Sequence, residues 1–189
     1  YYRTDGWLSL SLHSYHGGAI DLPVEHVSIN LYGSNQITGS EISPALRCTG
    51  NITMSQTCEY GKHSDLTITA GETQHAVSSK QLQLAPHTKM IGSKNIAAVA
   101  PSVEIYVSSP ADLVGGPDAD TTASLTPSKA TTVHYLEAQP IYKTVVIHGN
   151  GGQTASGQND VTIQQECGEW LDLSSFGFSC PRHILTGYL

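Results

Sequence analysis

The sequence predicts an all-β fold: an antiparallel β-sandwich of the immunoglobulin-like or jelly-roll type with two local disulfides. Three observations support this prediction. Short segments alternate between apolar and polar residues, turn residues separate them, and no segment shows an amphipathic helix of three turns. A chain of 189 residues fits one domain with a proper core, so we expect a single domain over residues 1–189.

The clearest strand is the first one, at residues 7–12. Leu8, Leu10 and Leu12 fall on one face of this strand, with Trp7 and two serines on the other. A wholly apolar face must be covered. Two interpretations remain open: the leucines cover the core of their own domain, or the strand is donated to the sheet of a neighbouring subunit and assembles a filament.

Further strands are predicted along the chain by the same alternation. Residues 24–32 place Val27, Ile29 and Leu31 on one face, and residues 103–107 form the clearest interior strand.

Residues 109–129 are rich in Ser, Thr, Asp, Gly and Pro and predict a long flexible loop. Residues 90–100 are apolar without a clear period and stay unassigned. No repeat of fixed period is visible. The other expected strands are residues 46–54, 56–60, 65–70, 81–84, 133–136, 142–148 and 161–165.

The four cysteines form two pairs that are close in sequence. The simplest pairing joins Cys48 to Cys58 and Cys167 to Cys180, because neither spacing suits a redox or zinc motif. Disulfides of this kind predict an oxidising compartment, so we expect a secreted protein, extracellular or at the cell surface. The sequon that begins at Asn51 fits that location as a glycosylation site.

The charge of the chain excludes one class of partner. The formal net charge is -7, and no Lys or Arg cluster exists for binding phosphates, so nucleic acid is not an expected partner. Only 13% of the residues are charged, against about 25% in ordinary domains. No apolar run is long enough for a membrane helix. We expect self-assembly with identical subunits and consider glycans as a further class of partner.

Nine histidines raise the question of a metal site. The best candidates are His13, His16 and His26, which follow or begin predicted strands. His13 and His16 have opposite parity and would converge only through a turn. The other histidines are scattered singly and are typical of a polar sheet face. We therefore expect no metal and no cofactor.

The evidence for catalysis is incomplete. Residues 144–152 end in His-Gly-Asn-Gly-Gly, which resembles the oxyanion loop of α/β-hydrolases, but no Gly-x-Ser-x-Gly elbow follows or precedes it. A β-hairpin with a glycine-rich loop explains this segment better. Glu104 and Glu137 lie in predicted strands, as glycosidase carboxylates often do, yet any β-sandwich has such residues. We expect no enzymatic activity.

Aromatic residues favour binding over catalysis. Sugar-binding surfaces present tryptophan and tyrosine side chains. The candidates in this chain are Trp170 and four tyrosines that flank turns: Tyr15, Tyr32, Tyr60 and Tyr142. The sequence therefore predicts a non-enzymatic extracellular structural or adhesive subunit of a surface appendage, filament or coat. A secreted carbohydrate-binding module is the first alternative, and a secreted hydrolase or metal-binding protein is the second.

Overall fold

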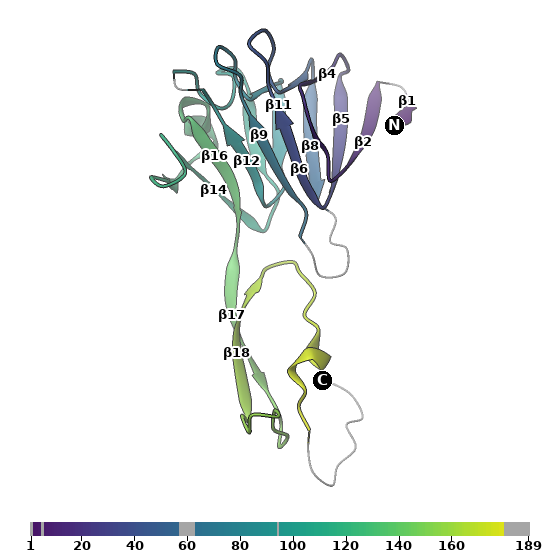
Figure 1. Ribbon diagram of the computed structural model, residues 1–189, viewed down its shortest axis with the longest axis vertical. Coiled ribbons are helices and arrows are strands. Elements are labelled where there is room, and N and C mark those ends of the chain that lie inside the picture. The colour runs from purple at the N-terminus through teal and green to yellow at the C-terminus, as the bar shows by residue number, and fades with distance from the viewer. Residues whose placement is uncertain (1, 5, 57–62, 94, 180–189) are drawn as a thin grey trace. The chain divides into compact units, whose positions relative to one another are not determined.

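The computed structural model describes residues 2–4, 6–56, 63–93 and 95–179 (Figure 1). The chain divides into two compact units, Tyr1–Pro140 and Ile141–Leu189. The first unit contains a hydrophobic core, and the second contains a two-stranded ribbon.

The first unit is a chain of similar coils, each of which runs through three sheets in turn. Four coils follow one another, and β13 (Glu104–Val107) begins a fifth. The first three coils each contribute one strand to every sheet, and in the fourth Val99 bridges to Val77 in place of a third strand. The coils comprise β2 (Trp7–His13), β3 (His16–Gly17) and β4 (Ile20–Leu22); β5 (His26–Tyr32), β6 (Ser34–Thr38) and β7 (Leu46–Cys48); β8 (Asn51–Gln56), β9 (Asp65–Thr69) and β10 (Val77–Ser78); then β11 (Gln81–Leu84) and β12 (Thr88–Ile91).

Equivalent strands of successive coils pair in parallel. The first sheet has the order β1-β2-β5-β8-β11-β13, and all of its pairs are parallel except that β1 (Tyr2–Thr4) lies antiparallel to β2. Strands β3, β6, β9 and β12 stack in the second sheet, and β4, β7 and β10 stack in the third. Figure 1 shows β2, β5, β8 and β11 side by side in one layer. A chain that winds through three stacked parallel sheets is a parallel β-helix.

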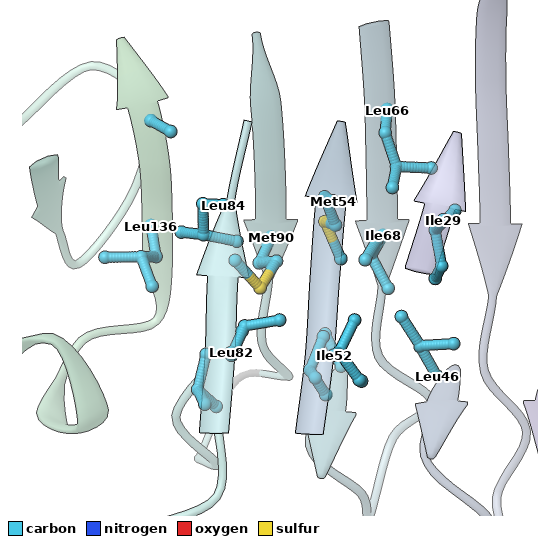
Figure 2. Packing of buried hydrophobic residues seen from close by; sticks show 14 of the residues in the cluster. Ile29, Leu46, Ile52, Met54, Leu66, Ile68, Leu82, Leu84, Met90 and Leu136 are labelled. Carbon is cyan, nitrogen blue, oxygen red and sulfur yellow. The ribbon is translucent and has the colours of Figure 1, made fainter. Parts of the chain in front are cut away.

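Apolar side chains of one coil lie directly on those of the next, and these rows form the core. In the first sheet, one row consists of Leu8, Val27, Ile52, Leu82 and Ile105, all at most 3% exposed. The rows of the three sheets meet inside the coil, as Figure 2 shows for the labelled side chains. Each coil alone is too thin to bury its apolar face, so burial between stacked coils stabilises the unit.

The chain reverses after the fifth coil begins. Strand β14 (Ala111–Gly116) pairs antiparallel with β16 (Tyr135–Pro140), and β16 pairs antiparallel with β12. The short β15 (Ala123–Ser124) and the 3-10 helix η1 (Pro127–Thr132) connect them. This antiparallel end extends the second sheet to seven strands.

The second unit is built on one hairpin. Strands β17 (Tyr142–His148) and β18 (Asp160–Glu166) pair antiparallel along their whole length. The glycine-rich segment of residues 149–157 joins them, which confirms the expected hairpin with a glycine-rich loop in place of an oxyanion loop. The 3-10 helix η2 (Leu173–Phe176) follows, and Gln153 bridges to Ser179.

The all-β prediction is confirmed, but the antiparallel sandwich is wrong. Alternation correctly places strands at residues 7–13, 26–32, 65–69, 81–84 and 104–107. It says nothing about the direction of the neighbouring strand, because that neighbour lies one coil away in sequence. The apolar segment left unassigned begins within β12, and its Ala98 and Val99 are buried.

The two predicted disulfides are also wrong. Cys48 and Cys167 are free thiols, and among the described residues no cysteine pair lies at disulfide distance. Cys58 and Cys180 lie outside the described residues. Cys48 is an inward residue of β7, and its Sγ donates to the carbonyl oxygen of Val24 at 3.2 Å. Cys48 is therefore a core residue of the first unit.

Leu8 and Leu12 are buried in the core of their own unit and β2 pairs with β5, in agreement with the first of the two interpretations of this strand. One other expectation differs from the structure. The segment expected to be a flexible loop contains β14, whose Leu113 and Val114 are buried. Residues 117–124 are polar, and their composition led to a loop prediction that also included β14.

Candidate functional site

The outward side chains of the first sheet form one continuous surface, called the outer face below. Because successive side chains of a strand alternate between its two faces, burial of the apolar row turns every second residue outward. The parallel register then aligns these outward residues from strand to strand. The outer face comprises Trp7, Ser9, Ser11, His13, His26, Ser28, Asn30, Tyr32, Asn51, Thr53, Ser55, Gln81, Gln83, Glu104 and Tyr106.

The first row of the outer face crosses five strands at equivalent positions: Trp7, His26, Asn51, Gln81 and Glu104. The rings of Trp7 and His26 stack, with centroids 4.5 Å apart and planes 15° from parallel. Nδ1 of His26 lies 3.4 Å from Nδ2 of Asn51. At the far end, Nε2 of Gln81 donates to Oε2 of Glu104 at 3.0 Å. The row is therefore held in order by contacts between neighbouring strands.

A second aromatic pair lies at the other end of the same strands. The rings of His13 and Tyr32 stack with centroids 4.3 Å apart and an interplanar angle of 5°. Between the two pairs the outer face carries hydroxyl and amide groups, among which Nδ2 of Asn30 donates to Oγ of Ser9 at 3.2 Å. Trp7 and His13 are six positions apart along β2, which corresponds to about 20 Å.

The edge of the outer face at β13 is hollowed. An open pocket of about 390 Å³ is lined by residues 101–106 together with Pro127, Ser128 and Thr131. The hydroxyl of Tyr106 donates to Oε2 of Glu104 at 3.3 Å, and the Tyr106 side chain is 50% exposed. The outer face thus ends on an exposed ring, a carboxylate and a shallow hollow.

The outer face is polar without being charged. Glu104 is the one carboxylate among the residues of the outer face, and none of these residues is Lys or Arg. Trp7 and Tyr106 are 55% and 50% exposed, which is high for large aromatic side chains. Such a surface offers hydrogen-bond donors and acceptors beside flat apolar rings, and it offers little to a phosphate backbone.

The structure does not bring the three candidate metal ligands together. His13 and His26 occupy opposite ends of the paired strands β2 and β5, because His13 is opposite Tyr32 and His26 is opposite Trp7. His16 lies in β3, in the second sheet. Both His13 and His26 stack on an aromatic ring, so each has a place in the outer face instead.

The structure places the candidate modification sites in surroundings that differ from the predicted ones. Asn51 begins β8 in the first row of the outer face, half-buried, and does not lie in a disulfide-closed loop. Nothing supports a glycoprotein, and a glycan on Asn51 would cover the row. Burial raises the pKa of the Cys48 thiol, which suits a core residue and not a reactive one. The prediction of secretion depended on the disulfides and loses that basis.

The other candidate residues are dispersed. Glu137 lies in β16 of the second sheet, where it accepts from the Tyr135 hydroxyl at 2.7 Å, so it forms no pair with Glu104 of the first sheet. Trp170 is 96% exposed in the second unit. Tyr142 begins β17, Tyr15 is half-buried and packs against the core, and Tyr60 lies outside the described residues.

Sequence reasoning named His13, His26 and Tyr32 separately but missed that they belong to stacked pairs. It treated Trp7 only as the polar side of a strand. Alternation along each strand could have shown that Trp7 and His26 lie on the same side of the sheet, because both point away from the apolar row of their strand. Their stacking depends on which strands are neighbours, and the winding of the chain into coils determines this.

The fold is a parallel β-helix whose outer face carries two stacked aromatic pairs with hydroxyl and amide side chains between them. Comparison of the chain with family models, with curated proteins and with solved structures finds no match. Among the described residues, no helix has the length and apolar character needed to cross a membrane.

Proposed function

We propose that this protein is a non-enzymatic binding module whose outer face holds an extended, neutral oligosaccharide. The observation that carries the proposal is the aligned first row with its stacked Trp7–His26 pair and, across the same face, the His13–Tyr32 pair. Two stacked aromatic pairs about 20 Å apart suit a ligand that is long and narrow.

The chemistry of the outer face matches that of a sugar chain. A sugar has an apolar face of C–H groups, which packs on an exposed ring, and a rim of hydroxyls, which donate and accept hydrogen bonds. Trp7 and Tyr106 supply exposed rings, and the serine, threonine, asparagine and glutamine side chains between them supply both donors and acceptors.

Other ligand classes fit this surface less well. A nucleic acid needs clustered cations, and the outer face has none. A tightly bound protein partner needs a contiguous apolar centre, whereas here the exposed rings are separated by hydroxyl and amide groups. A neutral glycan needs neither. The carboxylate of Glu104 at the edge further disfavours anionic sugars.

Binding to an array of neutral, anionic and amino-sugar oligosaccharides tests the proposal. Wild-type protein should bind neutral glycans, with an affinity that changes little between low and high salt, because no charge pairs form. Trp7→Ala and Tyr32→Ala should each weaken binding about tenfold, equivalent to about 1.4 kcal/mol.

Trp170→Ala is the matched control, because Trp170 is the other tryptophan of the chain, is 96% exposed and lies in the second unit. It should bind like the wild type. Failure to bind any neutral glycan, or equal losses for Trp7→Ala and Trp170→Ala, would overturn the proposal.

A further inference from the structure

The pocket at the end of the outer face has two walls. One wall is β13 with the turn before it, and the other is the 3-10 helix η1, through Pro127, Ser128 and Thr131. Ala130 of η1 is buried, so this helix is anchored to the core beside β13. All residues that line the pocket belong to the first unit, so the coil itself builds the pocket.

The charge in this pocket is a single carboxylate. Among the described residues that line it, Glu104 is the only charged one. Gln81 and Tyr106 both donate to Oε2 of Glu104, at 3.0 and 3.3 Å. These two contacts hold the carboxylate in position and leave Oε1 to accept from a ligand. Because the chain also has a net charge of -7, the pocket attracts a positively charged group.

The other lining groups suit the ring of a sugar. Tyr106 is two residues from Glu104 on the same face of β13, and its half-exposed ring can pack on C–H groups and attract a cation. Ser102, Ser128 and Thr131 supply hydroxyls that donate and accept hydrogen bonds. The volume of about 390 Å³ lies at the lower end of small-molecule sites, so the pocket admits one small unit.

We infer that this pocket binds a sugar unit with a free amino group, at the end of the glycan that the outer face holds. The inference rests on the proposed function, because Glu104 ends the first row and a glycan lying along that row reaches the pocket. The ammonium group pairs with Oε1 of Glu104 beside the Tyr106 ring, and the sugar hydroxyls face the hydroxyl groups of the pocket. A lysine side chain offers the same ammonium group but no hydroxyls.

Titration of the ¹⁵N-labelled full chain with glucosamine, N-acetylglucosamine and glucose, followed by NMR, tests the inference. At about pH 6 the amine of glucosamine carries a proton. Glucosamine should shift the amide signals of residues 102–106 and 128–131. It should bind at least about threefold more tightly than the other two sugars, since an exposed ion pair and a cation–π contact each contribute modestly. High salt should reduce this preference.

Glu104→Gln should abolish the preference for glucosamine and leave the response to glucose unchanged, because the amide keeps the shape of the side chain and removes its charge. Glu137→Gln is the matched control. Glu137 also accepts from a tyrosine two residues away, Tyr135, but it lies in the second sheet and does not line the pocket. This variant should prefer glucosamine as the wild type does.

Equal affinities of the wild type for glucosamine and glucose would overturn the inference. So would a preference that survives Glu104→Gln. Lysine amide that binds as tightly as glucosamine would show that the pocket recognises any ammonium group and would overturn its assignment to a sugar. The array of neutral glycans tests the outer face and this titration tests the pocket, so failure of one is distinguishable from failure of the other.

Discussion

At the residue scale, Asn35 is the most connected buried polar side chain of the first unit. It is 1% exposed at the corner between β5 and β6. Its Oδ1 accepts from the Tyr15 amide at 2.8 Å, and its Nδ2 lies within 3.2 Å of the carbonyl oxygens of Tyr32, Gly33 and Asp65. One side chain thus joins three successive coils at their corners.

Asn35→Ala should lower the free energy of unfolding by about 3 kcal/mol, because it leaves several buried backbone groups without partners. Urea unfolding followed by circular dichroism measures this. Asn30→Ala, on the outer face, removes one half-exposed hydrogen bond to Ser9 and should cost less than about 1 kcal/mol. Equal losses for the two variants would contradict the assigned role.

At the element scale, the corners of the β-helix require close approach between coils. The amide of Asn51 donates to the Glu25 carbonyl oxygen at 2.7 Å, and the amide of Lys80 donates to the Gly50 carbonyl oxygen at 2.8 Å. A Cβ atom on Gly50 would overlap the Glu25 carbonyl. Gly50 is therefore the residue that lets one corner stack on the next.

Gly50→Ala should destabilise the first unit by about 1–3 kcal/mol or more, because backbone of two coils must separate to admit the methyl group. Gly18→Ala is the matched control. A Cβ on Gly18 meets nothing within 4 Å, so this variant should be neutral or slightly stabilising. Thermal unfolding of both variants decides the matter, and a neutral Gly50→Ala would show that the corners can move apart.

At the scale of the whole molecule, stability is unevenly distributed between the two units. Strands β5, β8 and β9 pair on both sides and bury apolar rows, whereas β17 and β18 form a two-stranded sheet with no buried apolar side chain. Local opening should therefore cost much less in the second unit than in the middle of the coil.

Native-state hydrogen exchange at low protein concentration should show this difference. Amides of β5, β8 and β9 should exchange slowest, and those of β17 and β18 should exchange orders of magnitude faster. Uniform protection of the two units would contradict this distribution of stability.

The sequence alone determined where several of the strands lie and which way their side chains point. Alternation at Trp7–His13 and His26–Tyr32 needs no knowledge of the fold, because the two faces of a strand follow from backbone geometry. It therefore placed Leu8, Val27 and Ile29 on the apolar faces of their strands and Trp7 on the opposite face. It also identified the hairpin around the glycine-rich loop.

Only the tertiary structure decided which strands are neighbours, and with them the site. Equivalent positions of successive coils are unevenly spaced, 19 residues from Trp7 to His26 but 30 from Asn51 to Gln81, so no period reveals the coil. The corner loops absorb these differences in length. The stacking of His26 on Trp7 follows from hydrogen bonding between distant strands, and local pattern carries no information about that pairing.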